Sequence, residues 1–115
     1  MYPTLFSTPG VKAFAEEIDA ERQAQLAKFG DQKHPDVAGD ATTQCDRRDV
    51  YAERAEYYRD LNDGQNSFDW AGILLEEVYE ALAESDPAKL RAELIQVAAV
   101  CAAWIYDIDN RPTAA

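Results

Sequence analysis

Apolar side chains recur every three or four residues along most of the chain, which is the spacing of amphipathic helices. The residues Ser7, Thr8 and Pro9 are typical of a helix start, and Gly30 is typical of a helix end. Between them, the positions at helical spacing are Val11, Phe14, Ile18, Arg22, Gln25 and Phe29. A second helix is expected from about Asp46 to Asn62, and its periodic positions are Val50, Tyr51, Tyr57, Tyr58 and Leu61.

Two more helices are predicted in the second half of the chain. The turn-forming run Asn62-Asp63-Gly64 ends the preceding helix, and Ser67 is a good N-cap for a helix from Phe68 to about Glu84. The run Ser85-Asp86-Pro87 combines a cap with a proline in the first turn, and it opens a helix to about Asp109. The apolar stripe of this last helix is Leu90, Leu94, Val97, Cys101, Ile105 and Ile108.

The pattern predicts an all-α fold, a helical bundle of four main helices forming a single domain over residues 1–115. The five glycines and five prolines gather at a few points, which favours long helices over many short strands. Residues 30–46 have no periodicity, so a long loop is expected after the first helix. Residues 97–103 are apolar around most of the helix, so we expect a homodimer or higher homo-oligomer to cover them.

Composition narrows the choice of partners. Asp and Glu outnumber Lys and Arg by 22 to 11, and a charge of −11 argues against nucleic acid or an anionic membrane surface as a partner. No apolar run approaches the roughly 20 residues of a membrane span, and the N-terminus does not resemble a signal peptide. Two cysteines, Cys45 and Cys101, are too few for a disulfide framework, so a cytoplasmic protein with reduced thiols is expected.

A group of carboxylates lies on the third predicted helix. Residues 60–88 contain eight acids and no Lys or Arg. Four of these acids share an arc of about 100° on the helix: Glu76, Glu77, Glu80 and Glu84. Like charges four residues apart cost roughly 0.2–0.5 kcal/mol each, so a helix built only for solubility would normally intersperse Lys. A solvated acidic face is one interpretation, and a Mg²⁺ site is the other, because Mg²⁺ prefers oxygen ligands.

The fourth predicted helix offers a matching face. Glu93 and Gln96 lie three residues apart on it, and Asp107 returns to nearly the same angle. This face borders the apolar stripe, so its polar groups are placed to look into a cleft between helices. The stretch LLEEVYEALAESDPAKLRAELIQVAAV, within residues 69–109, resembles the MazG-like, all-α nucleoside triphosphate pyrophosphohydrolases. The family pattern is Glu-Glu-x-x-Glu, a spacer, and Glu-x-x-Asp.

The resemblance implies a specific chemistry. Enzymes of that family use Mg²⁺, with Mn²⁺ as a possible substitute, to cleave the α–β phosphoanhydride of an NTP or dNTP into a nucleoside monophosphate and pyrophosphate. It implies that Glu77, Glu80 and Glu93 are metal ligands, and that Glu76 and Glu77 are catalytic, with Glu76 orienting the attacking water. Gln96 stands where the family pattern has Asp. Its amide oxygen is the fourth candidate metal ligand, but it is neutral, so the site loses one negative charge. Asp107 or Asp109 would compensate if the helix brings one of them close.

Other residues are candidates for substrate binding. Arg54 would grip phosphate oxygens, although an ion pair or a side chain lying along the surface explains it equally. Tyr58 and Trp70 would stack on a base, although aromatic residues at helical spacing usually form a core. Gln25 and Asp107 complete the candidates for contacts with the nucleotide.

Two other functions fit the same sequence. One is a nucleotide-binding relative that has lost catalysis, which Gln96 suggests. The other is an acidic interaction protein that binds a basic partner through its charge. Pyrophosphate release separates the enzyme from both, and saturable binding of a divalent cation separates the first alternative from the second.

Overall fold

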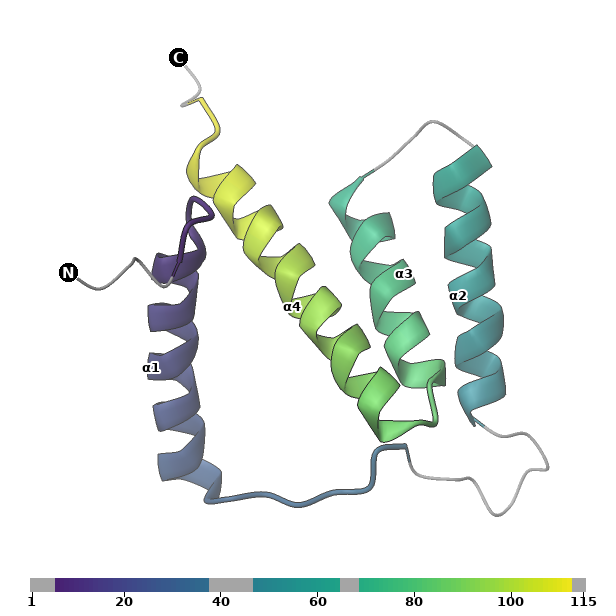
Figure 1. Cartoon of the computed structure of the whole chain (residues 1–115), viewed down its shortest axis with the longest axis horizontal. Helices are drawn as coiled ribbons and strands as arrows, with labels where there is room; N and C mark the ends of the chain where they lie inside the picture. Colours follow the sequence, from purple (N-terminus) through teal and green to yellow (C-terminus); the bar gives the residue numbers. More distant parts are fainter. Residues whose placement is uncertain (1–5, 38–46, 65–68, 113–115) are drawn as a thin grey trace. The chain divides into compact units, whose positions relative to one another are not determined.

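The computed structural model describes residues 6–37, 47–64 and 69–112, and these residues form four helices and no strand (Figure 1). The helices are α1 (Val11–Phe29), α2 (Arg47–Gly64), α3 (Trp70–Ala83) and α4 (Pro87–Asp109). The predicted all-α class is therefore confirmed. A loop was expected over residues 30–46; residues 30–37 have no helix or strand, and the rest of that segment lies outside the described residues.

The helix ends follow local capping chemistry. The Gly30 N–H donates to the carbonyl of Leu26 at 2.9 Å, and the positive φ of 70° at this glycine ends α1. At the start of α3 the cap is Asp69, whose Oδ1 accepts from the N–H of Gly72 at 2.7 Å, whereas the predicted cap, Ser67, lies outside the described residues. Asp86 Oδ2 accepts from the N–H of Lys89 at 3.0 Å and begins α4 as predicted.

The chain divides into two compact units. One contains the described residues up to His34 together with those from Ala102 onward, and the other runs from Pro35 to Cys101. In the first unit, Gly10 has a φ of 84°, and a Cβ added there would lie 2.6 Å from Cδ2 of Tyr106. A side chain at this position would therefore be strained by both backbone conformation and lack of space.

The core of the second unit lies between α2 and α3 (Figure 1). Ala55 and Ala81 are only 3% and 2% exposed, and their small side chains allow the two helices to approach closely. On the same interface the ring of Tyr79 stacks on Tyr51 and Tyr58, with centroids 6.1 and 5.7 Å apart. Tyr51 near the start of α2 contacts Tyr79 in the second half of α3, and Asn62 near the end of α2 contacts Gly72 near the start of α3. The two helices are therefore antiparallel.

Helices α1 and α4 contain no buried residue. Large apolar side chains are exposed on both: Ile18, Leu26 and Phe29 on α1, and Leu94, Ile95, Ile105 and Ile108 on α4. Apolar side chains gathered on a helix normally require a covering surface. In the described part of the chain, no helix is both long enough and apolar enough to cross a membrane.

Candidate metal-binding site

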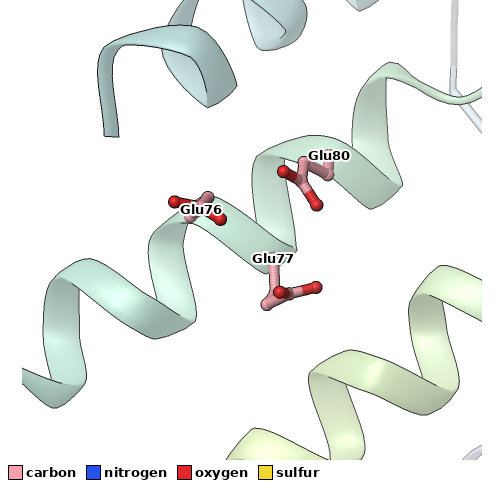
Figure 2. Close-up of side chains that lie close together, drawn as sticks. All are labelled: Glu76, Glu77 and Glu80. Atoms are coloured by element: carbon pink, nitrogen blue, oxygen red, sulfur yellow. The ribbon is translucent and has the colours of Figure 1, made fainter. Parts of the chain in front are cut away.

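Three carboxylates of α3 lie close together. Glu76, Glu77 and Glu80 each offer one oxygen, and these three atoms lie within 4.8 Å of one another (Figure 2). The residues occupy neighbouring turns of the helix, so the backbone itself holds their Cβ atoms on adjoining parts of its surface. All three side chains are half-buried, which reduces the water available to screen their repulsion.

Glu93 adds a carboxylate from α4. Its Oε2 atom and that of Glu77 are both buried, and neither has a hydrogen-bond partner. Buried polar atoms in proteins are nearly always hydrogen-bonded, because leaving a donor or acceptor unsatisfied costs about 1–3 kcal/mol and more for a charged group. These two oxygens on different helices therefore lack the partner that buried polar atoms normally have.

The pKa values of two carboxyls in the cluster are raised, as expected for like charges that are partly buried close together. Burial raises the pKa of the Glu77 carboxyl, and the charges of Glu80, Glu93 and Glu76 raise it further. Burial likewise raises the pKa of Glu93, followed by the charges of Glu80 and Glu84. Carboxylates of α3 and α4 are therefore close enough to raise one another's pKa values.

Glu76 is held by a buried amide at the end of α2. Asn62, only 5% exposed, donates from Nδ2 to Glu76 Oε1 at 3.1 Å and to the carbonyl of Gly72 at 3.2 Å. A Cβ on Gly72 would lie 2.8 Å from Asn62 Oδ1 and 2.9 Å from Asp69 Oδ1. Gly72 therefore leaves the space that the Asn62 side chain occupies beside α3. The hydrogen bond from Asn62 in turn orients the Glu76 carboxylate.

A cavity of about 490 Å³ adjoins the carboxylates. Its lining comes from α2, from the end of α3 and from α4: Ala52, Ala55, Glu56, Arg59, Glu80, Ala83, Glu84 and Glu93. Arg59 Nη2 donates to Glu80 Oε1 at 3.0 Å, and this hydrogen bond raises the pKa of Arg59. Among the described lining residues Arg59 is the one cation, opposed by four carboxylates.

The remaining sequence candidates of this unit lie apart from the cavity lining. Gln96 is exposed on α4, one turn beyond Glu93. The Arg54 guanidinium lies 5.7 Å from the ring centroid of Tyr79, and Arg54 lines a separate hollow of about 200 Å³ with Arg47, Val50 and Tyr51. Tyr58 is stacked on Tyr79, and Trp70 is half-buried in the first turn of α3.

Gln25 and Asp107 belong to the other unit, and both are exposed. Gln25 accepts a hydrogen bond from Arg22 Nη1 at 2.7 Å. Asp107 forms an ion pair with Arg111 at 3.1 Å, and Asp109 is the last residue of α4. Their predicted roles toward a nucleotide or a metal stay predictions.

Sequence reasoning missed Arg59 and Asn62. Asn62 was interpreted only as part of the turn that ends the second helix, and Arg59 lies next to the aromatic positions that dominate its pattern. A signal was available, because Ala52, Ala55, Arg59 and Asn62 follow one another at helical spacing. The alanines on this face of α2 allow α3 to approach closely. The polar residues on the same face of α2 must then find hydrogen-bond partners on α3.

Comparisons of the chain with protein-family models, curated proteins and solved structures found no match. The donors are carboxylate oxygens, which suit Mg²⁺, and two of them are buried without a partner. The described residues thus fit a hard divalent cation.

Proposed function

We propose that the chain is a Mg²⁺-dependent nucleotide pyrophosphohydrolase that converts an NTP, a dNTP or a related nucleotide into the monophosphate and pyrophosphate. The observation that carries this proposal is the pair of buried, unpartnered oxygens of Glu77 and Glu93 beside the converging carboxylates of α3. The resemblance of residues 74–100 to the MazG-like pattern supplies the reaction class.

Each residue has a proposed role. Glu77, Glu80 and Glu93 hold the metal, and Gln96 contributes its amide oxygen if its side chain turns inward from the exposed face of α4. Mg²⁺ bound there, or Mn²⁺ in its place, would screen the phosphate charge and acidify a water. Glu76, oriented by Asn62, accepts a proton from the water that attacks the α-phosphorus. The bond between the α-phosphorus and the bridging oxygen then breaks, and pyrophosphate leaves.

The adjoining cavity is the proposed place of the phosphates. Its volume of about 490 Å³ falls within the range of small-molecule sites. The four carboxylates of its lining would repel a free nucleotide, so the substrate is expected to bind as a metal complex. The acidic composition of the whole chain is consistent with this requirement.

We further propose that the protein acts as a homodimer or higher homo-oligomer. Exposed apolar side chains on α1 and α4 support this, because a second copy of the chain would remove them from water. A cytoplasmic location remains the expectation from the cysteines, of which the described Cys101 is a free thiol.

The test is the release of pyrophosphate and phosphate from a panel of nucleotides, with and without Mg²⁺. We expect Mg²⁺-dependent release of pyrophosphate together with a monophosphate from at least one of them. Glu80→Gln should abolish turnover and leave the helical circular dichroism spectrum unchanged. Glu53→Gln removes the same charge from an exposed site on α2 outside the cavity, and it should retain activity.

The same assay separates the alternatives. Nucleotide binding in Mg²⁺ without any pyrophosphate release would replace the enzyme with a binding-only relative. Absence of saturable Mg²⁺ binding would refute the metal site and favour an acidic interaction protein. Near-normal turnover by Glu80→Gln would refute the assignment of the catalytic centre while keeping the reaction.

A further inference from the structure

We propose that Arg59 is a phosphate-binding residue that changes its ion-pair partner during the binding cycle. In the structure it pairs with Glu80, and once Glu80 binds Mg²⁺ the guanidinium would turn to the phosphate oxygens of the substrate. This inference rests on the proposed function and extends it to a residue that the MazG-like motif does not include.

Arg59 lies in the lining of the cavity, within reach of a carboxylate of the proposed metal site. Arg59 and Glu80 line the same cavity, and their side chains meet at 3.0 Å from two different helices. The Arg59 side chain is 48% exposed, whereas that of Glu80 is 22% exposed. Glu80 is therefore held in place by its surroundings, and the long arginine side chain is free to reorient into the cavity.

Arg59 and a bound divalent cation would compete for the same carboxylate, that of Glu80. A divalent cation at Glu80 neutralises the charge that attracts the guanidinium, and the two cations repel each other at such short range. Arg59 then needs a new anion, and a phosphate group matches its planar fork with two parallel hydrogen bonds. Phosphate is also favoured over the other carboxylates of the cavity lining as the new partner of Arg59, because the bound nucleotide would place its phosphate oxygens in the same cavity.

Arg54, the arginine that sequence reasoning favours, lies elsewhere. Its guanidinium covers the ring of Tyr79, and it lines a hollow that shares no described residue with the carboxylate cavity. The structure therefore gives phosphate contact within the carboxylate cavity to Arg59, one helical turn and a residue further along α2.

The test uses two measurements on Arg59→Gln in the full chain: calorimetric titration with MgCl₂ alone, and titration with inorganic pyrophosphate at saturating Mg²⁺. Loss of the competing ion pair should increase Mg²⁺ affinity about two- to fivefold. Loss of the phosphate contact should weaken pyrophosphate binding about 10- to 100-fold. Arg111→Gln is the matched control, because it removes an arginine from another exposed ion pair, and both affinities should stay unchanged.

The opposite signs of the two effects distinguish this role from a structural one. A structural ion pair would lower both affinities or neither, and either result overturns the proposal. Arg59→Lys keeps the positive charge but cannot form two parallel hydrogen bonds to a phosphate. Its pyrophosphate affinity should therefore lie between those of the wild type and Arg59→Gln. The lysine variant also provides the test if Arg59→Gln fails to fold. If the wild type itself binds no Mg²⁺, the proposed function fails and takes this inference with it.

Discussion

Glu77→Gln should stabilise the metal-free protein while destroying its activity. Glu77 is half-buried in a group of like charges, and its Oε2 has no hydrogen-bond partner. Glutamine has the same shape but no charge, and its amide N–H groups can donate to the neighbouring carboxylates. A residue retained for metal binding at the expense of stability should behave in this way.

The magnitude follows from the repulsions that disappear. Glu77 and Glu80 lie three residues apart on α3, where a like-charged pair costs about 0.2–0.5 kcal/mol. Glu93 on α4 also raises the pKa of Glu77, and we count its repulsion as a second contribution of similar size. The gain in free energy of unfolding is then about 0.4–1 kcal/mol, or about 2–5 °C in Tm for a domain of this length.

The pH dependence gives an independent check. Because the pKa of Glu77 is raised in the folded chain, the folded state binds more protons than the unfolded state above the ordinary carboxyl value of 4.5. This carboxyl therefore lowers stability as the pH rises through that value toward the raised pKa. The difference in Tm between Glu77→Gln and the wild type should be small at pH 4.5 and should grow toward pH 7.

Thermal unfolding followed by circular dichroism, with EDTA and with Mg²⁺, measures all of these quantities. Mg²⁺ should raise the Tm of the wild type and have little effect on the variant. Glu53→Gln again serves as a charge-matched control, and its Tm should change by less than about 1 °C in EDTA. A Glu77→Gln protein that is less stable than the wild type in EDTA at pH 7 would refute the reasoning.

Three further outcomes are expected. Gly72→Ala should lower the free energy of unfolding by about 1–3 kcal/mol in urea titrations, because its Cβ would lie 2.8 Å from Asn62 Oδ1. Asn62→Ala should cost about 1–3 kcal/mol because it removes two hydrogen bonds and leaves Glu76 Oε1 without this donor, and it should lower kcat more than it raises KM because Glu76 loses its orientation. Light scattering should show that glutamate at both Ile18 and Phe29 reduces the oligomer to a smaller species, whereas an unchanged mass would exclude this face of α1 from the interface.

The helices could be predicted from sequence because their signals are local. Gly30 ends α1, and Asp86 with Pro87 begins α4, since capping depends on residues within a few positions of the helix end. The cap of α3 was harder to assign, because Ser67 and Asp69 are both good caps and only the observed bond from the Gly72 N–H selects Asp69. Which faces of α1 and α4 are covered depends on partners that no local pattern specifies.

The site was predictable only in part. Residues 76, 77 and 80 lie on one helix, so their convergence follows from helical geometry alone. Glu93 was placed by the resemblance, and the structure brings it to the same carboxylates. Arg59 and Asn62 reach the site through the packing of α2 on α3, which depends on the alanines between the helices. Spacing within one helix shows which residues share a face, but it does not show which residues of the neighbouring helix they meet, because that depends on the register of the two helices.

Under the proposed function, the charges around the cavity predict that metal and nucleotide assist each other's binding. Four carboxylates and one guanidinium line the cavity, so a polyphosphate that enters alone meets net repulsion. A cation held by Glu77, Glu80 and Glu93 would remove part of that repulsion and would release Arg59 from Glu80, as proposed above, to bind phosphate. Because coupling between two ligands is reciprocal, the nucleotide must strengthen metal binding by the same factor. The proposal therefore predicts that the like-charged arrangement, which opposes folding by itself, makes the binding of each ligand depend on the other.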